Sequence, residues 1–359
     1  MPVFNLPAFR KSLEWIEAGR AVAIATVVDT WASAPSPTGS RLIVGEGGDF
    51  TGSVSGGFVE AEVIGAGLEV IETRVPRLLE FGVADDAAWH AGLSCGGHLK
   101  VYVEAIGAAQ AHHIRVLAEE CAARRACVLV TDVDCGEQRL VRADEVAGDP
   151  LADLLVPRLL QGRSVLLQHG GRRLFFDVQM PSVRLLLVGA TQIAQTLAAA
   201  ARLVGFEVTV ADPRPSFATE NRFPETPLVT EWPEAVPPEL GLDRFSAVAL
   251  LAHDPQIDDP ALCAALRAKC FYVGALGSKA NHRKRLERMR LAGFSDAEVA
   301  QIHAPIGFAI GAANGAEIAI AILAEIIAAL RCAHREQEIR ADAAVATPLA
   351  VSIHNIKET

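Results

Sequence analysis

One of the seven cysteines stands in a turn that suits chemistry. Cys95 lies inside the segment GLSCGG, where glycines leave a thiol accessible and surround it with backbone N–H donors. Such donors lower the pKa of a thiol, and the thiolate ligates soft metals or carries sulfur. The other six cysteines fall in predicted helices, strands or ordinary turns. Cys95 is therefore the candidate metal ligand, and an inert thiol is the alternative.

A second glycine-rich segment, GSVSGG at 52–57, opens a predicted helix. Backbone N–H groups of such a loop can surround a phosphate or a polar heterocycle. It is not a Walker A loop, because no Gly-Lys-Ser/Thr closes it. The candidate binding residues here are Ser53, Ser55, Gly56 and Gly57. Glu60, which follows them, is either an acid in the first turn of the helix or a residue that holds the loop.

The segment VGATQIAQTLA at 188–198 occupies the place of a dinucleotide fingerprint. Gly189 supplies the tight turn, and Asp212 ends the next predicted strand, where it could take a ribose hydroxyl. Thr191 stands where the second glycine would admit a diphosphate, so its side chain should obstruct one. The pattern predicts a nucleotide site with Gly189 and Asp212, or a Rossmann-like domain without an ordinary NAD site.

The most cationic run of the chain follows another strand, at GALGSKANHRKRLERMR (274–290). Gly277 shapes a loop, Ser278 can cap the next helix, and Lys279 and Arg283 lie in its first turns. The N-terminus of a helix favours an anion, so the run predicts a phosphate site. A solvated helix face is the alternative. The His-Asp pair at 253–254 could act in acid/base chemistry or orient a ligand, and helix capping by Asp254 is the alternative there. No Ser/His/Asp triad is apparent.

Two patterns of elements must position these residues. Before residue 106, short strands and one helix (59–73) alternate with the glycine-rich loops, and residues 107–180 read as a connector or α/β extension. From residue 181, strands alternate with helices, which predicts a doubly wound parallel sheet. The predicted domains are 1–106, 107–180, 181–334 and a tail at 335–359. The fold class is α/β, with a C-terminal Rossmann-like domain.

Composition excludes several classes of protein. The chain has 359 residues, is 51% hydrophobic and carries a formal charge of −10, which makes it a poor non-specific partner for nucleic acid. Its N-terminal sequence lacks the pattern of a signal peptide, and no apolar run is long enough to span a bilayer. An odd number of cysteines fits reduced thiols, so we expect a cytoplasmic location without a membrane span.

Eight segments together resemble the XdhC/CoxI family, the maturation factors of molybdenum hydroxylases such as xanthine dehydrogenase and CO dehydrogenase. The likeness covers about residues 10–330. The segments are TWASAPSPTGSRLIV (30–44), GSVSGGFVE (52–60), GLSCGGHLKVYVE (92–104), LLLVGATQIAQTLA (185–198), VTVADPRPSFA (208–218), HD (253–254), YVGALGSKANHRKRL (272–286) and PIGFAIGAANGAEIAIAILAEI (305–326). Each segment is a weak signal alone, and their common order makes the resemblance specific.

The resemblance implies an N-terminal domain of XdhC/CoxI type and a non-enzymatic chaperone that binds molybdenum cofactor, either as molybdopterin or in its dinucleotide form. It implies that the protein helps a cysteine desulfurase to exchange an oxo ligand for sulfur and then delivers the cofactor to an apo molybdenum hydroxylase. Members of the family are commonly homodimers. The alternatives are a nucleotide-dependent enzyme (an NAD(P) oxidoreductase or a nucleotide hydrolase) and an interaction scaffold.

Two positions depart from the family pattern. The family motif usually reads SGGCVE, and Phe58 replaces its cysteine. A phenyl ring neither ligates metal nor carries a persulfide, so Cys95 becomes the sole candidate thiol. The family's usual glycine at 191 is Thr191 in this chain.

Overall fold

The computed structural model describes residues 6–31, 36–82, 98–231 and 241–345. The chain divides into two compact units, residues 1–180 with 334–359, and residues 181–333. No helix within the described ranges is long and apolar enough to cross a membrane.

The first sheet of unit 1 is antiparallel and has five strands in the order β3-β2-β1-β5-β4. Its central strand, β1, is buried on both faces over most of its length, so its sequence is almost wholly apolar. The strands are β1 (Val22–Trp31), β2 (Arg41–Gly45), β3 (Phe50–Gly52), β4 (Arg77–Gly82) and β5 (His98–Ala105).

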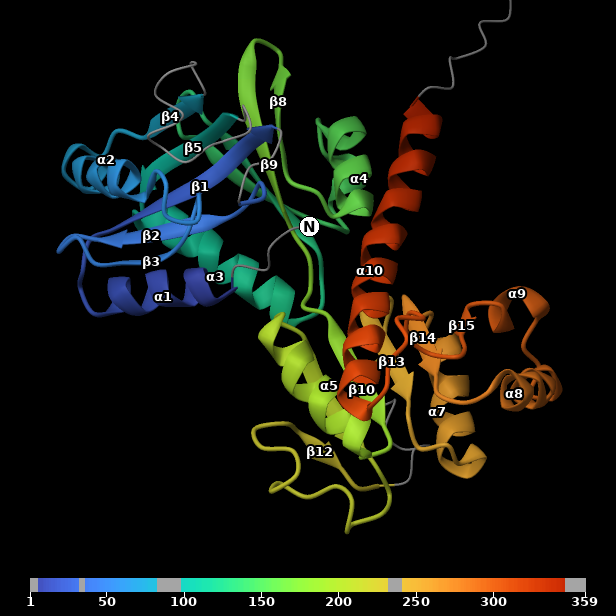
Figure 1. Ribbon diagram of the computed structural model, residues 1–359. Coiled ribbons are helices and arrows are strands. Elements are labelled where there is room, and N and C mark those ends of the chain that lie inside the picture. Colours follow the sequence, from blue (N-terminus) through green and yellow to red (C-terminus); the bar gives the residue numbers. More distant parts are fainter. Residues whose placement is uncertain (1–5, 32–35, 83–97, 232–240, 346–359) are drawn as a thin grey trace, which may run out of the picture. The chain divides into compact units, whose positions relative to one another are not determined.

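Helices cover both faces of this sheet (Figure 1). On one face, α2 (Glu60–Thr73) packs Val63 and Val70 against Ala25 of β1 and Leu42 of β2. On the other face, α1 (Leu6–Glu17) and α3 (Ala108–Ala122) pack against Ile24. Successive residues of β1 thus supply two different cores, as the alternation of side chains along a strand requires.

Residues 107–180 form a second antiparallel sheet, in the order β7-β6-β9-β8. Its hydrophobic cores are shared with the first sheet, because Val28 and Tyr102 pack with Val133 and Phe175. The elements are β6 (Cys127–Asp132), β7 (Gln138–Arg142), α4 (Ala152–Gln161), β8 (Val165–His169) and β9 (Arg172–Gln179).

Unit 2 contains a six-stranded parallel sheet in the order β12-β11-β10-β13-β14-β15. The chain starts in the middle at β10, and the order reverses between β10 and β13. This confirms the predicted doubly wound parallel sheet. The strands are β10 (Arg184–Val188), β11 (Glu207–Ala211), β12 (Leu228–Val229), β13 (Ser246–Leu250), β14 (Tyr272–Ala275) and β15 (Ile302–His303).

Helices lie on both faces of the parallel sheet (Figure 1). One core contains α5 (Gln192–Leu203) and α10 (Gly315–Val345), and the other contains α7 (Pro255–Arg267), α8 (Lys279–Leu291) and α9 (Asp296–Val299). Helix α7 begins at Pro255, because Asp254 caps it. Helix α10 continues past residue 334, because no glycine or proline interrupts the sequence until Pro348.

Candidate functional site

The glycine-rich loop before α2 is built around one carboxylate. Glu60 is buried, and its Oε1 accepts the Ser53 hydroxyl at 2.6 Å and the Ser55 amide at 2.9 Å. Its Oε2 accepts the Ser55 hydroxyl and, at 2.9 Å, the Gly57 amide. Glu60 therefore holds the loop, which is one of the two roles that the sequence allowed.

The remaining amides of the loop also donate inward. The Gly56 amide donates to the Ser53 hydroxyl at 2.8 Å, and the amides of Phe58 and Val59 donate to the Ser55 hydroxyl at 3.0 and 2.9 Å. A ligand at this loop would thus meet its outer surface and not its N–H groups. That surface consists of exposed Gly56 and Gly57, both at positive φ, and the ring of Phe58, which is 47% exposed.

The hydrogen bonds of the loop determine the charge of Glu60. Burial opposes ionisation, but the donors from Ser53 and Ser55 outweigh it and lower the pKa of Glu60 to about 2. The loop therefore encloses a permanent negative charge whose hydrogen bonds are satisfied from within.

Cys95, the candidate metal ligand, lies outside the described residues. Of the other cysteines, Cys121, Cys127 and Cys270 are buried, and Cys135 is exposed in the turn between β6 and β7. Within the described ranges, no group of three or more His, Cys, Asp or Glu side chains could hold a metal ion.

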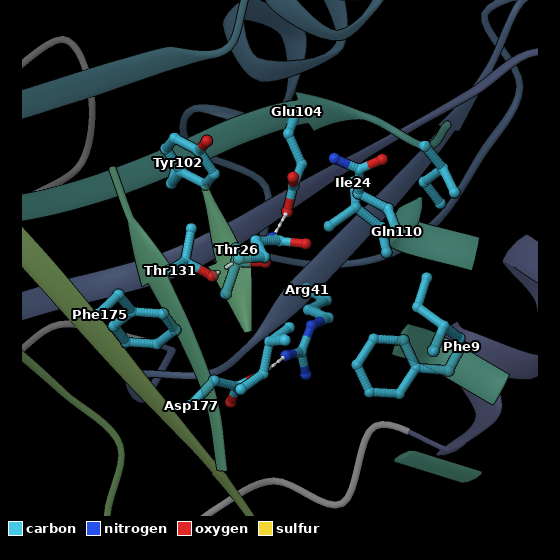
Figure 2. Close-up of a pocket in the computed structure, with 14 residues that line it drawn as sticks. Phe9, Ile24, Thr26, Arg41, Tyr102, Glu104, Gln110, Thr131, Phe175 and Asp177 are labelled. Carbon is cyan, nitrogen blue, oxygen red and sulfur yellow. Dashed lines mark hydrogen bonds and ion pairs between the residues drawn. The ribbon is translucent and has the colours of Figure 1, made fainter. Parts of the chain in front are cut away.

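A polar cavity lies inside unit 1, between its two sheets (Figure 2). Arg41 of β2 and Asp177 of β9 form a buried ion pair there, and the Arg41 guanidinium lies 4.2 Å from the centre of the Phe9 ring. The cavity volume is about 30 Å³. A pocket for a small molecule usually has ~300 Å³ or more, so this cavity accommodates water and excludes a pterin.

Glu104 of β5 also faces this cavity. Its Oε1 accepts a hydrogen bond from the side-chain amide of Gln138 at 2.8 Å. Burial raises the pKa of Glu104 to about 7, and the negative charge of Asp177 adds to that effect. The sequence does not reveal this cluster, because its members come from several separate strands and helices, each of which has the pattern of ordinary core.

In unit 2, backbone hydrogen bonds align the loops that follow successive strands. The Gly189 amide donates to Ala211 O at 2.8 Å, Leu251 N donates to Val188 O at 2.7 Å, and Leu276 N donates to Leu250 O at 2.9 Å. The loops after β10, β11, β13 and β14 therefore share the carboxyl edge of the sheet. This is where doubly wound folds bind ligands.

The loop after β10 makes close contact with the loop after β13. Gly189 has φ +100°, and a Cβ there would lie 2.6 Å from Ala252 N, so only glycine fits. Thr191 accepts the Ala194 amide at 3.3 Å and caps α5. The hydroxyl of Thr191 is thus used by the helix, in the place where a glycine would leave room for a diphosphate.

Asp212 joins two of these loops and has no exposed surface. It accepts the Ala190 amide at 2.7 Å and the guanidinium of Arg214 at 2.8 and 2.7 Å. Burial opposes the ionisation of Asp212, but these donors outweigh it and lower its pKa. Both oxygens are engaged, so Arg214 stands between the carboxylate and any ribose.

The cationic run after β14 divides into an outward and an inward part. Ser278 caps α8 through the Asn281 amide at 3.3 Å, after Gly277 at φ +136°. Ser278, Lys279 and Arg283 are all exposed. The structure therefore places the predicted phosphate-binding residues together on the accessible first turns of α8.

Arg285, two residues further on, points inward and was missed by the sequence analysis. It is buried, and its Nη2 donates to Leu276 O at 3.1 Å. Buried Asp258 on α7 lies near enough to interact electrostatically, and burial raises the pKa of Asp258 to about 7. The only sequence signal was the helical spacing of Arg285 from Ser278, which places the two on one face. Asp254 caps α7 through the Gln256 amide at 2.9 Å.

Comparison with known proteins follows the same two-part division. The model of the XdhC and CoxI family matches residues 15–82, and the model of the XdhC Rossmann domain matches residues 185–326. The chain is 29% identical over 331 residues to the molybdenum cofactor insertion chaperone PaoD of Escherichia coli, covering 92% of this chain and 89% of that protein. It is 28% identical to a Bacillus subtilis protein named as a probable xanthine dehydrogenase subunit, covering 87% of this chain and 94% of that one.

One solved structure has the same fold. A Bacillus halodurans protein described as a xanthine dehydrogenase superposes with a TM-score of 0.74 at 22% identity, covering 90% of this chain and 96% of that one. The two family models, the two curated relatives and the eight sequence segments, which occur in their common order, all indicate the same family. The chain belongs to the XdhC and CoxI family.

Proposed function

We propose that this chain is a chaperone that binds molybdenum cofactor as its cargo and supplies it to a molybdenum hydroxylase. The observation that carries the proposal is the similarity to an Escherichia coli molybdenum cofactor insertion chaperone over 92% of the chain. Because that relative is named as a chaperone, we assign no reaction of its own to this chain. We further propose a cysteine desulfurase and a second copy of the chain as partners in the cytoplasm.

The phosphate of the cargo has a candidate site at the start of α8. Lys279 and Arg283 are four residues apart, so they lie on one face of the helix, and both are exposed. Neither forms an ion pair with another described residue. The Ser278 side chain leaves some N–H groups of the first turn without partners in the helix, and the helix dipole adds to their attraction for an anion.

The loop of unit 1, taken by itself, offers a candidate contact for a flat ring. The exposed face of Gly56 and Gly57 beside the Phe58 ring suits a flat heterocycle better than a phosphate, because the amides there are already used. Cys95 remains the proposed metal ligand. The pterin that is bound to the purified protein identifies the form of the cofactor, either plain molybdopterin or its dinucleotide.

The test is the molybdenum and pterin content of the full chain, purified from cells that make the cofactor and measured by elemental analysis and pterin fluorescence. We expect both in the wild type, less than half as much in the double variant Lys279→Met/Arg283→Met, and no change in Arg290→Met on the exposed end of the same helix. Cys95→Ala should lose molybdenum while it keeps pterin.

Two results contradict the proposal. The first is a wild-type protein without pterin when it is isolated from such cells. The second is a molybdenum hydroxylase that reaches full activity in cells lacking this chain.

A further inference from the structure

The loop after β11 carries a basic and aromatic cluster that the proposed function does not use. Arg214 donates through Nε and Nη2 to both oxygens of the buried Asp212. This bidentate contact fixes the plane of the guanidinium. Among the described residues, none accepts a hydrogen bond from Nη1 of Arg214, and its side chain is 37% exposed.

An aromatic ring supports one face of this guanidinium. Arg214 lies 4.1 Å from the centre of the Phe217 ring, and Phe217 is itself 39% exposed. Arg222 lies 5.6 Å from the same ring and donates to Phe217 O. Arg222 makes no ion pair with a described residue, so the cluster has one guanidinium that is neutralised by Asp212 and one that is not.

The cluster is held in place by the body of unit 2. The Gln195 side chain of α5 donates to Arg222 O at 2.9 Å, and Arg202 donates to Pro224 O at 3.1 Å. Phe223 of the same loop is buried in the hydrophobic core. A loop anchored in this way presents its arginines without a large entropy cost on binding.

The position in the fold indicates the ligand. In doubly wound folds, the end of the second strand lies beside the ribose of a nucleotide; a free acid there takes the hydroxyls, and an arginine takes a ribose phosphate. Asp212 is not free, and Arg214 is presented in its place. We propose that unit 2 binds a purine nucleotide whose ribose carries a phosphate monoester, with the base on the open face of Arg214 and the phosphate between Arg214 and Arg222.

Two neighbouring features refine this proposal. Asp254 and Asp258 lie near enough to reduce the positive potential at Arg214, so Arg222 must supply the second charge. Thr191 occupies the approach of a diphosphate to α5, and so the ribose phosphate, and not a 5′-diphosphate, provides the anchor. This site shares no residue with the cofactor contacts proposed above.

The experiment compares three adenosine nucleotides that each carry two phosphates, titrated calorimetrically into the full chain. These are the 2′,5′-bisphosphate, the 3′,5′-bisphosphate and the 5′-diphosphate. We expect one of the ribose-phosphorylated isomers to bind at least ~10-fold more tightly than the 5′-diphosphate, which is ~1.4 kcal/mol in binding free energy. Equal affinities for all three, or no binding of any, would overturn the proposal.

Variants locate the site. Arg222→Met should reduce the preference to within ~3-fold while it leaves the Asp212–Arg214 pair intact. Arg214→Lys keeps a charge beside Asp212 and should lose the preference as well, since a lysine neither stacks nor donates bidentately. Arg290→Met is the control and should bind as the wild type does. If the preference survives in both site variants and their melting temperatures are unchanged, the proposed site is wrong.

Discussion

Replacement of Glu60 by glutamine tests how the glycine-rich loop is held. The pKa of Glu60 is about 2 in the fold against an ordinary value of 4.5. At ~1.4 kcal/mol for each tenfold change, this difference corresponds to ~3 kcal/mol of stability at neutral pH, and ~2 kcal/mol is a reasonable lower figure for a loop near solvent. Glu60→Gln should therefore lower the free energy of unfolding by ~2–3 kcal/mol. The side-chain NH₂ group of the glutamine would face the hydroxyl and amide groups that donate to the Glu60 carboxylate, and it cannot accept their hydrogen bonds.

Urea unfolding of the full chain measures this difference, and Glu62→Gln is the matched control. Glu62 lies in the same first turn of α2 but is exposed, so its loss should cost ~0.5 kcal/mol or less. Since the pKa of Glu60 is lowered by folding, its contribution is complete above pH 4.5 and should fall to less than half by ~pH 3. A Glu60→Gln cost no larger than that of the control, or one that is unchanged between pH 7 and pH 3, would refute this account of the loop.

Three further substitutions test the cores. Glu104→Gln should be more stable than the wild type by ~2–3 kcal/mol at pH 8 and equal to it at pH 4 in urea unfolding, because the raised pKa of about 7 makes ionisation of Glu104 costly as pH rises; equal stability at both values contradicts this. Gly189→Ala should lower the melting temperature far more than Gly205→Ala, where a Cβ meets nothing within 4 Å. If the two variants lower the melting temperature equally, the loop after β10 can move to accommodate a Cβ at position 189. Arg41→Met should lower the free energy of unfolding by ~3–5 kcal/mol in urea, because it leaves Asp177 buried without its partner. The double variant Arg41→Met/Asp177→Leu should recover part of that loss. If the losses of the two single variants are additive instead, the two side chains do not interact.

The parallel sheet was predictable from the sequence because its signals are local. Short apolar strands, turn glycines and amphipathic helices alternate from residue 181, and each can be read within about ten residues. The function of Asp254 as a cap was readable in the same way. That cap places the start of α7 at Pro255, although Pro260 lies inside the helix.

The side-chain hydrogen bonds and ion pairs at the candidate sites could not be predicted from the sequence. Nothing local shows that the Ser53 and Ser55 hydroxyls point at Glu60, or that Asp212 is consumed by Arg214 and the Ala190 amide. These contacts depend on side-chain direction across a turn, which a residue pattern does not specify. The Arg41–Asp177 pair is even harder to predict from the sequence, because 136 residues separate its members.

Hydrogen bonds to Glu60 and Ser55 hold the 53–60 loop, so its conformation does not depend on which side chain stands at position 58. The ring of Phe58 takes no part in the hydrogen bonds that Glu60 and Ser55 make, and only its backbone amide does. A cysteine, which the family resemblance places at this position, could be exchanged for phenylalanine without any rearrangement of the turn. Evolution could therefore alter what this loop touches while its scaffold stayed constant, and a single codon distinguishes a thiol-bearing member from this one.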